Sequence, residues 1–203
     1  MKLKIYITRD FDQMSQVAAN ITIGKITDFI PTDKKAYINF ILPTGNSPTG
    51  MYKIMAEKQD TFDPSIVVSH NLDEYVGLPG NTIAEREKHQ ESYLNFMRKN
   101  LFDKLKKPFY EYKVPGGCEI DQIKLEEELL KYENNPQAYF YEGVKDGKKG
   151  VAIIISNDSP SDYLKQIKKE TLDSYITSIK KHGKVDLAIV GIGGRGHIAF
   201  HES

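Results

Sequence analysis

A run of small and hydroxylated residues could hold an anion. Residues 42–50 read Leu-Pro-Thr-Gly-Asn-Ser-Pro-Thr-Gly and stand between an apolar stretch and a stretch of helical period. Small residues let backbone N–H groups approach a ligand closely, and Thr44 and Ser47 add hydroxyl donors. The following helix would contribute further N–H groups and a positive dipole end, so the segment predicts a phosphate site. It is not a Walker A loop, because no Gly-Lys-Ser/Thr follows. The alternative is an ordinary strand-to-helix turn capped by Ser47.

Two carboxylates follow the next apolar stretch. Asp73 and Glu74 lie just after residues 66–68, Ile-Val-Val. Carboxylates past the C-terminal end of a parallel strand lie where ligands bind in open α/β sheets, and a partly desolvated one can act as a general base. The alternative is that Asp73 or Glu74 only caps the next turn.

A third candidate segment follows residues 186–190. Gly191, Gly193 and Gly196 match the G-x-G-x-x-G pattern of dinucleotide sites, but only seven residues remain for the helix and the acidic residue that this site needs. We favour a backbone that lies against a small ligand and presents His197, with Glu202 placed to orient the imidazole or share its proton. His197 and His201 have the i, i+4 spacing of metal ligands, but no third ligand is evident and Gly196 disfavours a helix, so we expect no metal.

The elements that must position these residues alternate between strands and helices. Nearly continuous apolar runs predict strands covered on both faces, and helical periodicity with candidate caps at Asp10 and Ser47 predicts the helices. This alternation predicts a doubly wound, mostly parallel sheet between helix layers, a three-layer α/β/α fold. The predicted strands are residues 3–8, 36–42, 66–71, 151–156 and 186–191, and the predicted helices are residues 10–30, 48–59, 91–105, 120–132 and 161–182.

One stretch departs from this alternation. Residues 109–150 contain several turn signals, and Asp146-Gly147 between residues 139–144 and 151–155 predicts a β-hairpin. We expect an elaborated surface connection within a single domain of residues 1–203 rather than a second domain.

Composition excludes several classes of protein. The 203 residues carry 28 basic and 28 acidic side chains, and this zero net charge argues against a nucleic-acid binder. No apolar stretch approaches 18 residues, so we expect no membrane partner. The single cysteine, Cys118, cannot form an intrachain disulfide, which fits the cytoplasm.

In their order along the chain, these motifs resemble the glucosamine-6-phosphate deaminase (isomerase) family from about Ala36 to Ser203. The most specific matches are the Asp-Glu-Tyr-Val-Gly-Leu-Pro run and Gly-His-Ile-Ala-Phe-x-Glu. The matched segments are residues 42–48, 71–79, 89–93 with Phe96 and Met97, and 191–202.

The resemblance implies a modified doubly wound fold. It also implies conversion of an amino-sugar 6-phosphate to a ketose 6-phosphate and ammonia, without redox cofactor or essential metal. By position, Asp73 resembles the base that moves a proton between C1 and C2. His197 resembles the residue that helps open the sugar ring, and Glu202 its partner. The phosphate-side loop corresponds to Thr44, Gly45, Asn46 and Ser47.

The sequence departs from the family pattern at two places. Arg195 stands where the family has an acidic residue, and a cation there would lower the pKa of His197. The chain ends at Ser203, where the family continues with another strand–helix portion, so we expect a truncated sheet and a homo-oligomer. Two alternatives stay open: a hydrolase of the 6-phosphogluconolactonase type, and a sugar-phosphate binding module without catalysis.

Overall fold

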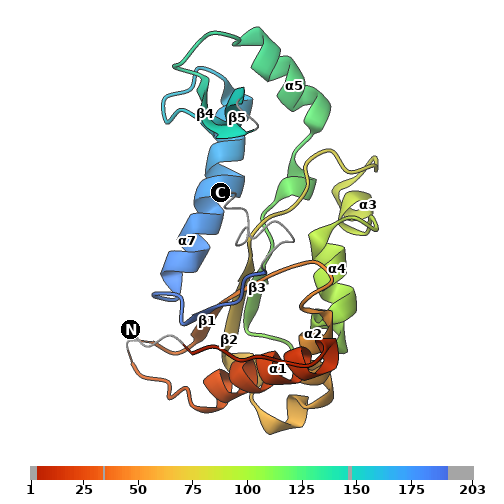
Figure 1. Cartoon of the computed structure of the whole chain (residues 1–203). Coiled ribbons are helices and arrows are strands. Elements are labelled where there is room, and N and C mark those ends of the chain that lie inside the picture. Colours follow the sequence, from red (N-terminus) through yellow and green to blue (C-terminus); the bar gives the residue numbers. More distant parts are fainter. Residues whose placement is uncertain (1–3, 34, 146–147, 192–203) are drawn as a thin grey trace. The chain divides into compact units, whose positions relative to one another are not determined.

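The computed structural model of the chain describes residues 4–33, 35–145 and 148–191 (Figure 1). The chain divides into two compact units. The first comprises Met1–Leu72, Tyr93–Val114 and Ile179–Ser203, and the second comprises Asp73–Ser92 and Pro115–Ser178. None of the helices in the described ranges is long and apolar enough to cross a bilayer.

The first unit is built on a parallel sheet of four strands in the order β3-β2-β1-β6. In its register Leu42 pairs with Asn71, and Ile41 pairs with Ala188. All of β2 and all of β1 except Ile41 are buried, as expected for strands covered on both faces. The strands are β1 (Ile38–Leu42), β2 (Val67–Asn71), β3 (Glu111–Lys113) and β6 (Leu187–Ala188).

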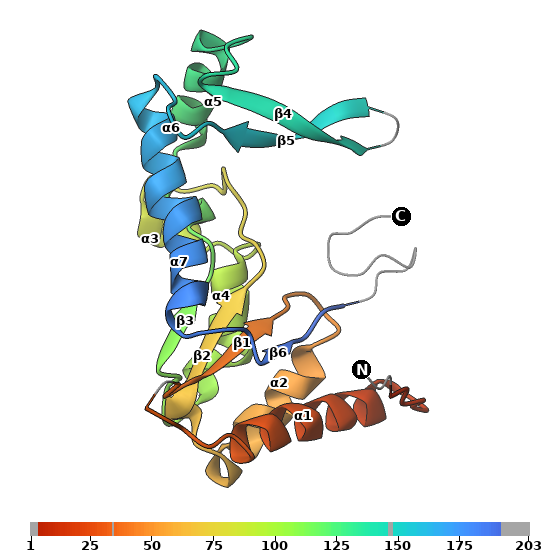
Figure 2. The same cartoon turned by 90° about the vertical axis from the view of Figure 1, so that its left-hand side faces the viewer.

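Helices cover both faces of this sheet. On one face, α1 (Phe11–Thr27), α2 (Thr49–Glu57) and α4 (Tyr93–Asn100) bury apolar side chains against β1 and β2. Figure 2 shows α1 and α2 lying side by side. On the other face, the Asn39 amide of β1 donates to the Ile179 carbonyl of α7 (Ser174–Lys181) over 3.0 Å. The predicted α/β fold with helix layers is therefore confirmed.

Several predicted elements agree with the structure in position. The Asp10 carboxylate caps α1 by accepting the Gln13 N–H over 2.8 Å, as expected. In contrast, α2 has Pro48 at its cap and no capping side chain, so the prediction of a Ser47 cap is wrong. Short 3-10 helices occupy Gln59–Thr61, Pro64–Ile66, Phe102–Lys104 and Gly117–Glu119.

Two strand predictions need correction, and one strand was not predicted. Residues 4–8 form no strand: Ile5 and Ile7 are 77% and 95% exposed, and a strand is not stable without a neighbour. Residues 151–156 do not join the parallel sheet but form half of an antiparallel hairpin. The sequence also missed β3, because Glu111–Lys113 is a polar edge strand with no apolar run.

The second unit contains this hairpin, and the predicted hairpin is confirmed. Its strands are β4 (Tyr139–Lys145) and β5 (Lys148–Ile155), while the turn at Asp146-Gly147 lies outside the described residues. Buried Ala138, Tyr139 and Leu164 form a small core with Leu125 and Leu129 of α5. The helices are α3 (Ile83–Glu87), α5 (Gln122–Lys131), α6 (Asp162–Gln166) and a π-helical segment (Ile167–Asp173) that leads into α7.

Candidate active site

The three segments singled out in the sequence follow three adjacent parallel strands. The loop of residues 42–50, here called the anion loop, follows β1, the acidic pair follows β2, and the glycine-rich segment follows β6. The Ile189 N–H donates to the Ile41 carbonyl over 3.0 Å, which extends the β6–β1 alignment past the end of β6. The carboxyl ends of these strands share one edge of the sheet, where open α/β folds bind their ligands.

The anion loop has an open, exposed tip. Gly45 adopts φ +100°, a conformation that side chains rarely tolerate, and Gly45, Asn46 and Ser47 are exposed. The Asn46 carbonyl accepts the Thr49 hydroxyl over 2.7 Å, which closes the turn at the start of α2. The Ser47 hydroxyl does not cap α2, so Ser47 does not have the role that the alternative of a capped strand-to-helix turn gave it.

Two buried side chains anchor the base of this loop. The Tyr52 hydroxyl donates to the Pro43 carbonyl over 2.5 Å, and the Asn71 amide donates to the Leu42 carbonyl over 2.9 Å. Tyr52 is fully buried, and burial raises its pKa well above the usual value, so the phenol keeps its proton. Because both carbonyls accept hydrogen bonds from buried side chains, the orientation of the backbone at the start of the loop is fixed. Sequence analysis missed Tyr52, whose only signal was a polar tip on the apolar face of a predicted helix.

Glycine at position 50 permits close packing directly behind the loop. A Cβ atom there would lie 2.1 Å from the Ser15 hydroxyl oxygen and 2.9 Å from the Phe11 ring. Such contacts are far inside van der Waals separation, so only glycine lets the first turn of α2 approach α1 this closely.

Asp73, in the second unit, has a pKa shifted toward neutrality. Its side chain is half-buried and hydrogen-bonds with none of the described residues. Burial, and secondarily the negative charge of Glu74, raise the pKa of Asp73 from 3.8 to about 6. The charge of Asp73 contributes in turn, after burial, to raising the pKa of Tyr175 in α7 to about 12. A carboxylate with a pKa near neutrality can both accept and return a proton.

The neighbouring Glu74 has a structural role. Its two carboxylate oxygens accept the Tyr75 N–H over 2.9 Å and the Ser92 hydroxyl over 2.8 Å. Gly117 lies against the Glu74 and Tyr75 carbonyls, where a Cβ atom would lie 2.9 Å and 2.5 Å away. The capping alternative considered for the acidic pair therefore describes Glu74 and not Asp73.

His70, at the end of β2, is a core residue. It is fully buried, with Nδ1 3.1 Å from the Asn39 side-chain oxygen. Burial lowers its pKa to about 4, so the imidazole is neutral at physiological pH. In the part of the chain that the structure describes, no three His, Cys, Asp or Glu side chains come together as a metal site.

The remaining candidates, His197 and Glu202, lie outside the described residues, as do Arg195 and His201. The structure therefore describes the anion loop and Asp73, each within its own unit, and the strand that leads toward His197.

Comparison with known proteins finds relatives that are named glucosamine-6-phosphate deaminase. Glucosamine-6-phosphate deaminases from Phocaeicola vulgatus, Parabacteroides distasonis and Borreliella afzelii are 33%, 32% and 30% identical over 202 residues. Each match covers 98% of this chain but only 55–56% of the relative, so the chain spans just over half the length of these relatives. No family model matches the chain.

Solved structures of two kinds share the fold. A monomeric glucosamine-6-phosphate deaminase matches with a TM-score of 0.59 at 20% identity, covering 98% of this chain and 58% of that one. The 6-phosphogluconolactonase from Plasmodium vivax matches with a TM-score of 0.58 at 18% identity, covering 95% and 49%. These structures support the fold alone, and both kinds share it. The sequence relatives named above are deaminases. The resemblance indicated by the motifs is confirmed: this chain is a relative of the glucosamine-6-phosphate deaminases along almost its whole length.

Proposed function

We propose that the protein acts on an amino-sugar 6-phosphate, converting glucosamine 6-phosphate and water to fructose 6-phosphate and ammonia. The observation that carries this proposal is the Asp73 carboxyl, which is half-buried with a pKa of about 6 and follows the strand next to the anion loop. The choice of glucosamine 6-phosphate as substrate rests on the relatives, which are named glucosamine-6-phosphate deaminase.

In this reaction Asp73 is the base. After ring opening, its carboxylate takes the proton from C2 and returns it to C1, which turns the 2-amino aldose into a 2-imino ketose. Water then adds to C2 and ammonia leaves. A carboxyl with a pKa of about 6 is mostly ionised at pH 7 yet basic enough to hold the proton between the two carbons.

The other residues bind the substrate and open the ring. Thr44, Gly45, Asn46 and Ser47 hold the 6-phosphate through backbone N–H groups and hydroxyls at the start of α2. His197 passes a proton to the ring oxygen, and Glu202 orients it. Arg195, two positions before His197, disfavours the imidazolium, so it lowers the pKa of His197 and shifts the pH dependence of ring opening to lower pH than an acidic residue would.

We also propose that the protein is cytoplasmic. The single thiol, Cys118, is buried and unpaired, which agrees with a cytoplasmic protein. We also propose that the protein forms a homo-oligomer.

Ammonia release from glucosamine 6-phosphate by the purified chain tests the function. The Asp73→Asn variant should lose at least about a hundredfold in rate, because the amide cannot accept the proton. Asp158→Asn, at an exposed position of the second unit, is the matched control and should keep full activity. Hydrolysis of 6-phosphogluconolactone without ammonia release would replace this function by the lactonase alternative. Full deaminase activity in Asp73→Asn would remove Asp73 from the mechanism.

Substrate binding is tested separately from turnover. In the Asp73→Asn background, calorimetry should detect glucosamine 6-phosphate binding, and Ser47→Ala should weaken it several-fold. Binding without turnover in the unmodified chain would support the non-catalytic alternative instead.

A further inference from the structure

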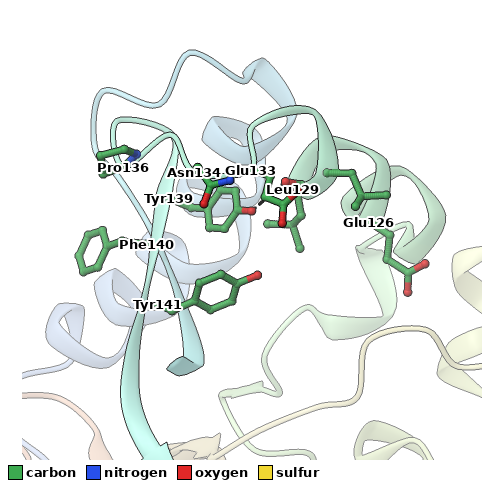
Figure 3. A pocket seen from close by; sticks show the side chains of 9 residues that line it. Glu126, Leu129, Glu133, Asn134, Pro136, Tyr139, Phe140 and Tyr141 are labelled. Carbon is green, nitrogen blue, oxygen red and sulfur yellow. Dashed lines mark hydrogen bonds between the residues drawn. The ribbon is translucent and has the colours of Figure 1, made fainter. Parts of the chain in front are cut away.

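The elaborated part of the chain carries a groove that the proposed reaction does not use. The groove has a volume of about 620 Å³ and lies between the C-terminal half of α5 and the start of β4, within the second unit (Figure 3). Tyr139 and Tyr141 point from β4 toward α5, and the Tyr139 hydroxyl donates to the Leu129 carbonyl over 2.8 Å. Two tyrosine rings therefore form one side of the groove, and a hydrogen bond to α5 fixes the position of Tyr139.

The surface of this groove is apolar and has no cover within the chain. Leu130 is 72% exposed, Tyr141 55% and Phe140 39%. Adjacent exposed side chains of this size form the kind of patch that soluble proteins use for contacts with other molecules.

The rim of the groove carries uncompensated negative charge. Glu126 accepts a hydrogen bond from the neutral Gln122 amide over 2.7 Å, and Glu133 forms no ion pair with any described residue. Elsewhere on α5, Glu128 is paired with Lys131 at 3.5 Å. Because the groove is apolar and its rim is acidic, a surface that combines aliphatic side chains with a cation would complement it.

The same unit displays a surface of that chemistry. Leu172 and Ile176, one helical turn apart at the junction of the π-helical segment and α7, are 44% and 46% exposed. Lys169, within a turn of Leu172, is exposed and forms no ion pair with any described residue, although Lys165 and Lys168 do. Because these side chains stay exposed, the groove of their own chain does not cover them.

We propose that the α5–β4 groove of one chain binds the Lys169–Leu172–Ile176 surface of a second copy. Leu172 and Ile176 enter the apolar groove, and Lys169 meets Glu133 at its rim. The two surfaces differ, so the contact is head-to-tail: each pair leaves one free groove and one free helix, which recruit further copies into a chain or a ring.

Light scattering and sedimentation velocity over a concentration series test this contact. The unmodified chain should gain mass with concentration, less so at high salt because the pairing is partly electrostatic. Glu133→Lys and Lys169→Glu should each weaken association at least about tenfold, because each opposes like charges at the rim. Glu127→Lys makes the same charge change on α5 outside the groove and should associate like the unmodified chain.

Mixing the two disrupted variants gives the decisive measurement. The Lys169→Glu chain keeps its apolar groove and Glu133, and the Glu133→Lys chain keeps its helix and Lys169. Both kinds of contact between the two variants join opposite charges, so an equimolar mixture should associate about as strongly as the unmodified chain, and the double variant should regain self-association for the same reason. Circular dichroism verifies that each variant is folded, with Glu133→Gln as a milder substitute. A monomeric unmodified chain, a mixture that associates no more than either variant alone, or an equal effect of Glu127→Lys would overturn the proposal.

Discussion

Replacing Asp73 by asparagine should make the protein more stable while it removes the proposed base. The pKa of Asp73 is raised in the folded chain from 3.8 to about 6, so folding becomes less favourable as the carboxyl ionises. Below about pH 4 the group is protonated in both folded and unfolded chains and costs nothing. Between about pH 4 and 6 the unfolded chain releases its proton first, so stability falls as pH rises, and above pH 6 the full cost applies. Asparagine carries no charge at any of these values.

The magnitude follows from the displacement of the pKa. Each pKa step corresponds to about 1.36 kcal/mol, so a rise from 3.8 to about 6 has an upper limit of about 3 kcal/mol. The side chain is only partly buried, and water at its exposed part screens the charge, so we expect about 1–2 kcal/mol at pH 7. For a chain of this length, that gain raises the melting temperature by about 2–8 °C.

The assay is urea unfolding of the unmodified and Asp73→Asn chains at several pH values. The variant should be more stable at pH 7 and equal to the unmodified chain at pH 4, while Asp158→Asn should show no such crossover. Equal stability at pH 7, or a destabilised variant at both pH values, would refute the argument that Asp73 is ionised in an unfavourable site.

Three further predictions concern packing and reactivity. Tyr52→Phe leaves the ring in the core but frees the Pro43 carbonyl, so calorimetry should show sugar-phosphate binding several-fold weaker, with a stability loss of only about 1 kcal/mol by urea unfolding; unchanged binding would contradict the anchoring role. Gly50→Ala should cost about 1–3 kcal/mol in the same unfolding assay because its Cβ atom meets Ser15, and adding Ser15→Gly should recover part of the loss; a neutral Gly50→Ala would contradict the close approach. Burial, then the charge of Glu74, raise the pKa of the Cys118 thiol to about 11, so it should react with a disulfide reagent at least about tenfold more slowly in the folded chain than in urea; equal rates would show that the thiol is accessible.

Local patterns along the sequence predicted much of the framework. Short apolar runs predicted β1 and β2, and apolar positions three and four residues apart predicted α1, because burial on both faces or along one stripe leaves a periodic trace. Patterns failed where an element depends on its neighbour. Glu111–Lys113 is a strand only because β2 offers an edge, and residues 4–8 form none although they alternate apolar and polar side chains.

For the candidate site, the sequence determined which residue types are available and where along the chain they stand. It supplied the anion loop, the acidic pair and the glycine-rich segment, because backbone approach and proton transfer need these residues close together in the chain. Only the tertiary structure decided which of the two carboxylates accepts hydrogen bonds from its neighbours and which does not. Glu74 is held by Tyr75 and Ser92, and Asp73 is left partly desolvated. Burial and hydrogen bonding to residues distant in sequence set a pKa, and no local pattern records them.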